Sequence, residues 1–380
     1  MDYTAASLTF RIKKVLRYMR LFGPARTWIK VQGQLHMKKT YQRLPPRVTP
    51  PRSGGHVGLV GCGNFAYSNI AYYLRRRHGK VIRTCMDVDL NRAASLCQRY
   101  EARIYTDRVE DVVEDPAIDL VYIASNHASH AEYAIQALRA GKAVHVEKPH
   151  CVDEDQLQRL CQSLVETGGR IALGFNRPAS RFGRAIRRTL ESQDNPAMLN
   201  WFIAGHAIDP EHWYFREEEG GRVLGNLCHW TDFLYQMVPA RDRFPITITP
   251  TRAARSDCDI AVTYLFADGT IGALTFSAKG HTFEGVRERF AAHRGDVLIS
   301  MDDFQEMTVE IGSRKRRYRN WFRDHGHERR ICASYGMSRG DNEGESVSYV
   351  WETGALFLKT KEALETNEKV VVPAFSPPPV

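Results

Sequence analysis

Two short stretches of the sequence hold residue types that could do chemistry. The first is GLVGCGNFA, in which Gly61 and Gly63 are followed three residues later by Ala66. It lies between a short apolar run and a helical pattern, so its backbone can approach a phosphate closely at a helix N-terminus. The second is VHVEKP, in which Glu147 and Lys148 end another apolar run. Ligands of open parallel sheets bind at the carboxyl ends of the strands, where both stretches would lie.

The glycine pattern predicts a loop that binds a dinucleotide, with Asn64 and Phe65 among its contacts. Asp87 ends the next strand-like run. A carboxylate at this place suits the ribose 2′-hydroxyl of NAD and repels the 2′-phosphate of NADP, so NAD is expected in preference to NADP. The alternatives are a glycine turn without a ligand and an aspartate that is exposed in a turn, while Asp89 is interpreted as a bystander.

The elements that must position these residues alternate between strand and helix from His56 onward. Helical patterns such as SHAEYAIQALRAG and DEDQLQRLCQSLVETGG separate the strand-like runs. The strand-like runs are HVGLV, KVIRTCMDVD, IDLVYIASN, KAVHVEKP and RIALGFN. Such alternation predicts a parallel sheet with right-handed crossovers. We therefore expect a doubly wound Rossmann domain over residues 54–177.

The pattern changes after residue 178. A helix over 178–192 leads into longer runs, and Asp268-Gly269 indicates a hairpin between two of them. The runs are AMLNWFIAG, DIAVTYLF, IGALTFSA, RERFAAHR, DVLISM and MTVEIG. A long helix is expected over 345–367. Together they predict an α+β domain over 178–370 with an open, mostly antiparallel sheet, followed by a tail at 371–380. The fold class of the whole chain is α/β.

Residues 1–53 form a basic arm that ends in a Pro-rich linker. The first 55 residues hold 12 of the 53 Lys and Arg but only one of the 44 acidic residues, which leaves 41 basic and 43 acidic residues beyond them. Within residues 8–22, apolar side chains recur at helical spacing among basic ones up to Gly23-Pro24. The apolar set is Leu8, Ile12, Val15, Met19 and Phe22. The segment is interpreted as a contact with an anionic membrane, as packing on its own chain or a second subunit, or as a targeting sequence.

Composition excludes several classes of protein. The charge excess is confined to the arm and no nucleic-acid-binding motif is present, so no nucleic-acid partner is expected. The eight cysteines form no C-x-x-C pair, and neither a zinc ribbon nor another metal site is predicted. With no long apolar span and no secretory signal in the sequence, we expect a cytoplasmic protein, peripheral to a membrane if the arm binds one.

Several longer segments resemble the Gfo/Idh/MocA family of oxidoreductases. They are VYIASNHASHAEYAIQALRAGKAVHVEKP, GFNRPASRF and AGHAIDPEHWYFREEEGGRVLGNLCHWTDFL. The last is similar to a branch associated with bacterial surface-sugar and nucleotide-sugar metabolism. The resemblance covers residues 56–368 and leaves the arm outside. It implies a homo-oligomer that transfers hydride between NAD(P) and an alcohol or carbonyl of a sugar.

The resemblance also implies roles for individual residues. Lys148 would lie beside the nicotinamide and exchange the proton of the substrate hydroxyl. The alternative role for Lys148 is a structural ion pair. Its peptide bond to Pro149 could be cis. His229 would face the substrate, with Asp232 on the same helix face, unless it is a core histidine. Further cofactor contacts would be Ser125, Asn126, His127, His130 and Glu147. Further substrate contacts would be Arg177, His212, Trp213 and Asn226. Packing is the alternative for His130 and Trp213.

One departure from the family bears on activity. Many sugar dehydrogenases of the family have an acid four residues before the substrate-facing histidine, and the similar branch has a glutamate three before it. Gly225 and Asn226 occupy these positions. The sequence therefore predicts an NAD-dependent dehydrogenase or reductase. Its alternatives are an enzyme with tightly bound NAD and no net redox change, and a catalytically impaired NAD-binding regulator or scaffold.

Overall fold

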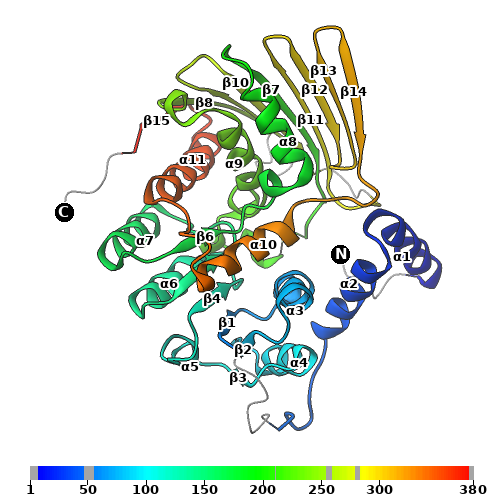
Figure 1. Ribbon diagram of the computed structural model, residues 1–380, viewed down its shortest axis with the longest axis vertical. Helices are drawn as coiled ribbons and strands as arrows, with labels where there is room; N and C mark the ends of the chain where they lie inside the picture. Colours follow the sequence, from blue (N-terminus) through cyan, green and yellow to red (C-terminus); the bar gives the residue numbers. More distant parts are fainter. Residues whose placement is uncertain (1–6, 47–54, 210, 254–258, 279–282, 376–380) are drawn as a thin grey trace. The chain divides into compact units, whose positions relative to one another are not determined.

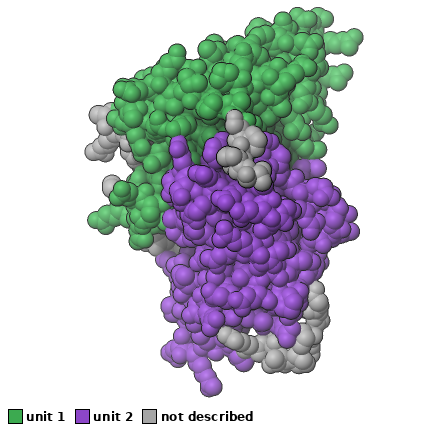
Figure 2. All heavy atoms as spheres, turned by 90° about the vertical axis from the view of Figure 1, so that its left-hand side faces the viewer, with its two compact units in different colours: residues 1–24, 175–326, 352–377 green, residues 25–174, 327–351, 378–380 purple. Residues whose placement is uncertain are grey.

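The computed structural model describes residues 7–46, 55–209, 211–253, 259–278 and 283–375. Figure 1 shows its ribbon, and Figure 2 colours its two compact units separately. The parallel-sheet unit comprises residues 25–174 and 327–351, and the mixed-sheet unit comprises residues 1–24, 175–326 and 352–377. None of the helices in the described ranges is long and apolar enough to cross a membrane.

The parallel-sheet unit is built on six strands in the order β3-β2-β1-β4-β5-β6. They are β1 (Val57–Val60), β2 (Ile82–Met86), β3 (Ile104–Thr106), β4 (Leu120–Ile123), β5 (Ala143–Val146) and β6 (Ile171–Leu173). Every neighbouring pair is parallel. This is the strand order of a doubly wound Rossmann sheet, in which the order reverses between β1 and β4.

Helices cover both faces of this sheet, with α3 and α4 on one and α5, α6 and α7 on the other (Figure 1). Strands β1, β4 and β5 are buried along their whole length, which explains their unbroken apolar sequences. The helices of the unit are α2 (Pro24–His36), α3 (Ala71–His78), α4 (Leu90–Tyr100), α5 (Glu110–Val113), α6 (His127–Arg139), α7 (Glu154–Thr167) and α10 (His327–Tyr335).

In its described residues, the mixed-sheet unit has nine strands in the order β14-β13-β12-β11-β7-β10-β9-β8-β15. They are β7 (Met198–Ala204), β8 (Ile246–Arg252), β9 (Asp259–Leu265), β10 (Ile271–Ser277), β11 (Arg287–Arg294), β12 (Val297–Asp302), β13 (Glu306–Ile311), β14 (Arg314–Arg319) and β15 (Val370–Val372). Its pairs are antiparallel except β7 with β10. The predicted hairpin is confirmed, because Gly269 joins β9 to β10 at a φ of 87°.

Helices α8 (Arg181–Leu190), α9 (Cys228–Met237) and α11 (Val347–Thr366) pack on one face of this sheet (Figure 1). The core between them centres on Trp201, whose ring lies 5.0 Å from that of Phe233 and 4.9 Å from that of Phe290. Side chains of β11 alternate between buried and exposed, so the opposite face of the sheet is open.

The described part of the basic arm, residues 7–46, contains two helices, of which one was predicted. α1 (Leu8–Phe22) ends at Gly23, which has a φ of 82°, as the sequence indicated. Pro24 then begins α2, where its missing N–H costs no hydrogen bond. The chain leaves the mixed-sheet unit after Pro24, so the two helices of the arm belong to different units.

Other elements differ from the sequence-based expectations. The short elements β3, α5, β8, β14 and β15 were not predicted, and the pairing of β7 with β10 makes the second sheet mixed. Residues 327–351 return to the parallel-sheet unit, although a single domain was expected over 178–370. Most of the expected Pro-rich linker (47–54) and the end of the tail (376–380) lie outside the described residues.

Candidate active site

The glycine-rich loop follows β1 at the reversal point of the parallel sheet. Gly61 has a φ of 85°, and a Cβ there would lie 2.5 Å from the Ser125 amide nitrogen, so only glycine fits. A Cβ at Gly63 would meet no atom within 4 Å, so the backbone there borders open space. Ala66 is buried and begins a π-helical turn (Ala66–Ile70) that leads into α3. This is the local form that a pyrophosphate-binding loop requires.

Asp87 lies at the carboxyl end of β2, beside this loop. One carboxylate oxygen accepts the Cys62 N–H at 2.7 Å, and the other accepts the Asp89 N–H at 2.9 Å. The side chain is 7% exposed, so its orientation is fixed by these two bonds. Asp89 accepts the Asn91 N–H at 2.9 Å as the N-cap of α4, which gives it a structural role.

The loop after β4 brings Ser125, Asn126 and His127 to the start of α6. His130, one turn along α6, is buried, with Nδ1 2.7 Å from the Pro149 carbonyl and Nε2 3.2 Å from the Ser125 carbonyl. Burial lowers the pKa of His130 to about 4, although both carbonyls favour the protonated ring. His130 therefore braces the loop after β4 against the loop after β5, which favours the packing alternative for this residue.

Glu147 and Lys148 leave the end of β5 in different environments. Glu147 is 7% exposed, and its carboxylate lies 3.3 Å from His145 Nε2. A Cβ on Gly174, the residue after β6, would come within 2.6 Å of that carboxylate. The Glu147 side chain therefore fits only because residue 174 is a glycine. Lys148 is partly exposed, and its bond to Pro149 is cis, the option that the sequence analysis held open.

The mixed-sheet unit holds the second group of predicted residues. His229 and Asp232 lie on α9, directly after a π-helical turn (Val223–Leu227) that contains Asn226. His229 is partly exposed, and its ring centroid lies 6.5 Å from that of Phe175. Asp232 is buried and accepts the Gln236 side-chain amide at 3.0 Å. The buried Asn226 Oδ1 has no hydrogen-bond partner among the described residues, which is unusual for a buried amide oxygen.

The predicted substrate contact Arg177 is engaged in an internal network. It is 8% exposed, donates to Glu288 and stacks on the Trp230 ring at 4.7 Å. Glu288 also accepts the Trp230 indole N–H at 2.7 Å and lies 3.2 Å from His325 Nε2. Burial raises the pKa of Glu288, but Arg177 and His325 outweigh it, so its pKa lies well below the usual value. This arrangement favours a structural role for Arg177.

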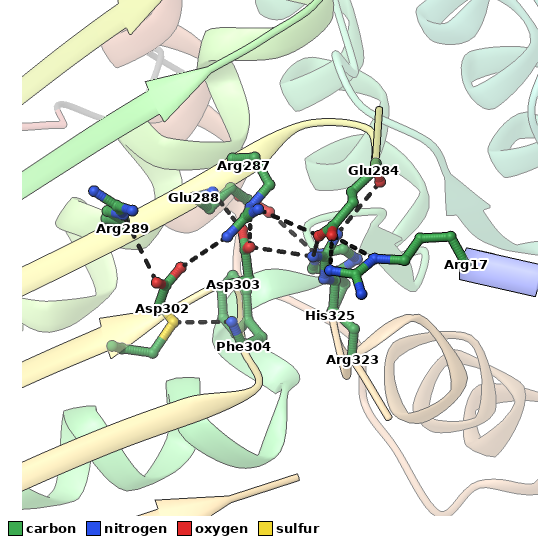
Figure 3. A network of polar contacts seen from close by, with 11 residues as sticks. Arg17, Glu284, Arg287, Glu288, Arg289, Asp302, Asp303, Phe304, Arg323 and His325 are labelled. Carbon is green, nitrogen blue, oxygen red and sulfur yellow. Dashed lines mark hydrogen bonds and ion pairs between the residues drawn. The ribbon is translucent and has the colours of Figure 1, made fainter. Parts of the chain in front are cut away.

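Sequence reasoning missed this buried charge network. The signal was available, because Glu288 has the same strand parity as the buried Phe290 and Ala292. Figure 3 shows its continuation, in which Arg323 donates at 3.1 Å to both Glu284 and Asp303.

His212 and Trp213 lie in the segment between β7 and α9. His212 is exposed and accepts the Tyr214 N–H at 3.3 Å. Trp213 is partly exposed, and its ring meets that of Tyr214 edge-on at 4.7 Å. Neither is a core residue, so both retain surface that a ligand could contact.

Comparison with known sequences shows what this chain is similar to. Residues 56–175 match the family model described as "Oxidoreductase family, NAD-binding Rossmann fold", named GFO_IDH_MocA. Residues 56–175 therefore form the NAD-binding domain of a Gfo/Idh/MocA oxidoreductase. The matched residues include every predicted cofactor contact. The family, the Rossmann fold and the NAD cofactor inferred from the sequence are confirmed.

Relatives within the family are distant. An uncharacterized oxidoreductase, YrbE, of Bacillus subtilis is 22% identical over 265 residues, which are 68% of this chain and 76% of that protein. Inositol 2-dehydrogenase of Burkholderia vietnamiensis is 30% identical over 146 residues, which are 38% of this chain and 43% of the enzyme.

Solved structures of the family share the fold over most of this chain. Levoglucosan dehydrogenase in complex with NADH and levoglucosan superposes with a TM-score of 0.73 at 16% identity, covering 84% of this chain and 99% of that one. GenD2 from gentamicin A biosynthesis, in complex with NAD, gives a TM-score of 0.69 at 19% identity, covering 87% and 100%.

Proposed function

We propose that this Gfo/Idh/MocA protein is an NAD-dependent dehydrogenase or reductase. Its substrate is a secondary alcohol, or the matching carbonyl, of a sugar or nucleotide sugar. The observation that supports this most is the position of Lys148. It follows β5 at the carboxyl edge of the parallel sheet, the edge that also presents Gly61, Asp87 and Ser125. Relatives of the chain include an inositol dehydrogenase and a levoglucosan dehydrogenase.

The loop residues fit the cofactor. The open space beside Gly63 admits a pyrophosphate close to the backbone, and the π-helical turn after it begins a helix whose N-terminus favours an anion. Asp87 would hold the adenosine ribose, with Asn64 and Phe65 as further contacts in the loop. NAD, when bound there, supplies the acceptor or donor of the hydride.

Lys148 would handle the proton that accompanies the hydride. In oxidation, a neutral Nζ takes the proton of the substrate hydroxyl; in reduction, the charged form returns it to the developing alkoxide. His229 would hold the substrate hydroxyl or share the proton, since imidazole exchanges protons near neutral pH.

Asn226 takes the place of the acid that the similar branch has. An amide hydrogen-bonds a sugar hydroxyl but cannot accept its proton. The buried Asn226 Oδ1 without a partner is the acceptor that a sugar hydroxyl would satisfy.

The proposal is tested by incubating the purified protein and NAD with a panel of sugars and nucleotide sugars while recording NADH. Formation of NADH with a member of the panel supports a dehydrogenase. Conversion of a substrate without net NADH, by a protein that copurifies with NAD, supports an enzyme with no net redox change. NAD binding with neither result contradicts the proposal and favours the regulator.

Asp87 should make the protein prefer NAD. Isothermal titration is expected to show NAD binding at least tenfold more tightly than NADP, about 1.4 kcal/mol. Asp87→Asn keeps an acceptor for the Cys62 N–H but loses the charge, so the preference should shrink. Asp89→Asn, at the N-cap of α4, is the matched control. Equal affinities for the two cofactors in the wild type would refute this role of Asp87.

We also propose that the open face of the mixed sheet joins subunits of a homo-oligomer. Strand register places one residue from each of five neighbouring strands in a continuous row: Leu265, Ile271, Met198, His293 and Leu298. Its four aliphatic members are 38–53% exposed. A row of exposed apolar side chains on an open sheet is typical of a surface that another subunit covers.

Met198→Asp combined with Phe202→Asp should therefore shift the protein toward monomer, because Phe202 is 48% exposed on the same face. Light scattering after size exclusion measures the change. Val165→Asp on α7, exposed by 51% in the other unit, should leave the assembly intact. An unchanged mass for the double variant would contradict the sheet-face interface.

The arm supports a refined form of the membrane interpretation. Lys14 and Arg17 of α1 contact Phe283 and Glu284, while Leu8, Ile12 and Leu16 are 64%, 51% and 56% exposed along one stripe. The apolar stripe that faces outward therefore differs from the predicted one. The end of α1 adjoins Arg323, two residues after Trp321, because the Leu21 carbonyl accepts the Arg323 N–H at 2.7 Å. Trp321 is 94% exposed and follows the basic strand β14. We propose that this surface binds an anionic bilayer, with the protein otherwise cytoplasmic.

Full-length protein should sediment with phosphatidylserine-containing vesicles but not with phosphatidylcholine vesicles, and salt should release it. Ile12→Glu with Trp321→Ala should abolish this sedimentation. Leu35→Glu on α2, exposed by 62% in the other unit, should not. Sedimentation that survives the double variant would exclude this surface as the membrane contact.

A further inference from the structure

Helix α2 of the arm is built into the dinucleotide-binding unit. One face of the helix, with Ile29, Gly33 and His36 at helical spacing, is buried there. Ile29 is 2% exposed and belongs to the core around β1 and α3. Earlier on the helix, Arg26 donates at 2.6 Å to Asn69 Oδ1, at the end of the π-helical turn that follows the glycine loop.

Gly33 lets α2 approach the glycine-rich loop closely. A Cβ at this position would lie 2.5 Å from Asn64 Oδ1 and 3.5 Å from the Ser68 Cβ. Asn64 belongs to the sequence motif that predicts the cofactor loop. A larger residue at position 33 would therefore displace at least the Asn64 side chain of this loop.

His36, three residues later on the same face, holds the loop directly. Its Nε2 lies 2.7 Å from the Cys62 carbonyl and its Nδ1 lies 2.9 Å from the Ser95 hydroxyl. The ring is 3% exposed and stacks on Tyr67 at 4.3 Å. Because a carbonyl can only accept, Nε2 must donate the proton, and the neutral ring then accepts from Ser95 at Nδ1.

Cys62 is thereby fixed from two sides. Asp87 accepts its N–H at 2.7 Å, and His36 donates to its carbonyl. In a planar trans peptide, the Cys62 carbonyl and the Gly63 N–H point in opposite directions. Holding the carbonyl therefore also fixes the direction of the Gly63 N–H, and Gly63 is the residue at which a side chain would meet only open space.

We propose that His36 is a positioning residue for the pyrophosphate of NAD, and that helix α2 of the arm is part of the dinucleotide site. The assignment rests on NAD binding and not on turnover. It would therefore stand even if no sugar proved to be a substrate.

The test measures affinity for NAD, ADP and adenosine in the full-length protein by titration calorimetry. His36→Ala should weaken NAD and ADP by about tenfold, since one hydrogen bond that orients the loop is lost. Adenosine, which has no pyrophosphate, should bind as before. His36→Gln, whose side-chain amide can donate to the Cys62 carbonyl, should recover most of the affinity. Trp28→Ala, exposed by 62% on the same helix, is the matched control and should change nothing.

Three outcomes would overturn the assignment. They are unchanged NAD affinity in His36→Ala, an equal loss for adenosine, and no recovery in His36→Gln while its melting temperature matches that of the wild type. If His36→Ala does not fold, the affinities of His36→Gln and of the wild type for ADP and for adenosine still test the assignment.

Discussion

Lys148→Ala is expected to lower the turnover number by roughly 10²–10⁴-fold while NAD still binds, because general acid–base catalysis typically contributes that much. Lys148→Arg should not restore turnover, since a guanidinium keeps its proton at any pH the protein tolerates. The measurement is NADH formation with the substrate that the panel identifies, together with NAD titration of each variant.

A matched control lies at the other end of the same strand. Lys142 precedes β5 and donates to the Asp115 carbonyl at 2.9 Å, away from the carboxyl edge of the sheet. Lys142→Ala should keep near-normal turnover. If Lys148→Ala does so as well, the lysine has only a structural role and another group must move the proton.

The largest effect on stability is expected at Glu288. Glu288→Gln leaves the buried Arg177 without a counter-charge, and breaking a buried ion pair in this way costs about 3–5 kcal/mol. Glutamine can still accept the Trp230 N–H, so the loss is mainly that of charge. Denaturant unfolding measures it. Glu306→Gln, in an exposed pair with Arg319, should cost less than about 1 kcal/mol.

A second substitution separates charge from packing. Arg177→Met in the Glu288→Gln background removes the unpaired cation, so much of the lost stability should return. Without such recovery, the cost arises from distorted packing and the ion-pair explanation is wrong.

The ion pair also predicts a pH dependence. The pKa of Glu288 lies well below its value in the unfolded chain. Its stabilisation is therefore fully present above the unfolded pKa of about 4.3 and is lost as the pH falls through the folded pKa. The difference in stability between wild type and Glu288→Gln should narrow in acid.

The sequence predicts the parallel sheet well because its strands are short, apolar and buried on both faces. That pattern also predicts the positions of two parts of the site, the loop of Gly61 and Gly63 and the residue Lys148 at the edge of the sheet. Strand β14, with the sequence RKRRYR, offers no apolar signal, and its place at the sheet edge explains why none is needed. Helix α2 is hidden for another reason. Gly33 lowers helix propensity, and the helix forms because its buried face packs on the loop after β1.

The substrate candidates were less predictable. Arg177 matches a family segment, but its partner Glu288 lies 111 residues away in the sequence, and only the fold brings the two together. Asp87 and Asp89 are equally acidic in the sequence. Their places in the pattern made Asp89 a bystander, and the hydrogen bonds give the physical difference, since Asp87 holds the glycine loop and Asp89 caps α4.

The division of the arm between two units has a consequence for how the chain folds during synthesis. Arg17 of α1 pairs with Glu284, a separation of 267 residues, and the mixed-sheet unit needs three separate segments of the chain, the last at 352–377. The arm precedes both sheets in the chain and leaves the ribosome before them, yet α1 cannot dock until residues 283 and 284 have been made. Helix α2 needs only the strands that come soon after it. Folding on the ribosome should therefore begin with α2 on the parallel sheet, while Lys14, Arg17 and Leu21 of α1 lack their partners until residues 283–323 have been made.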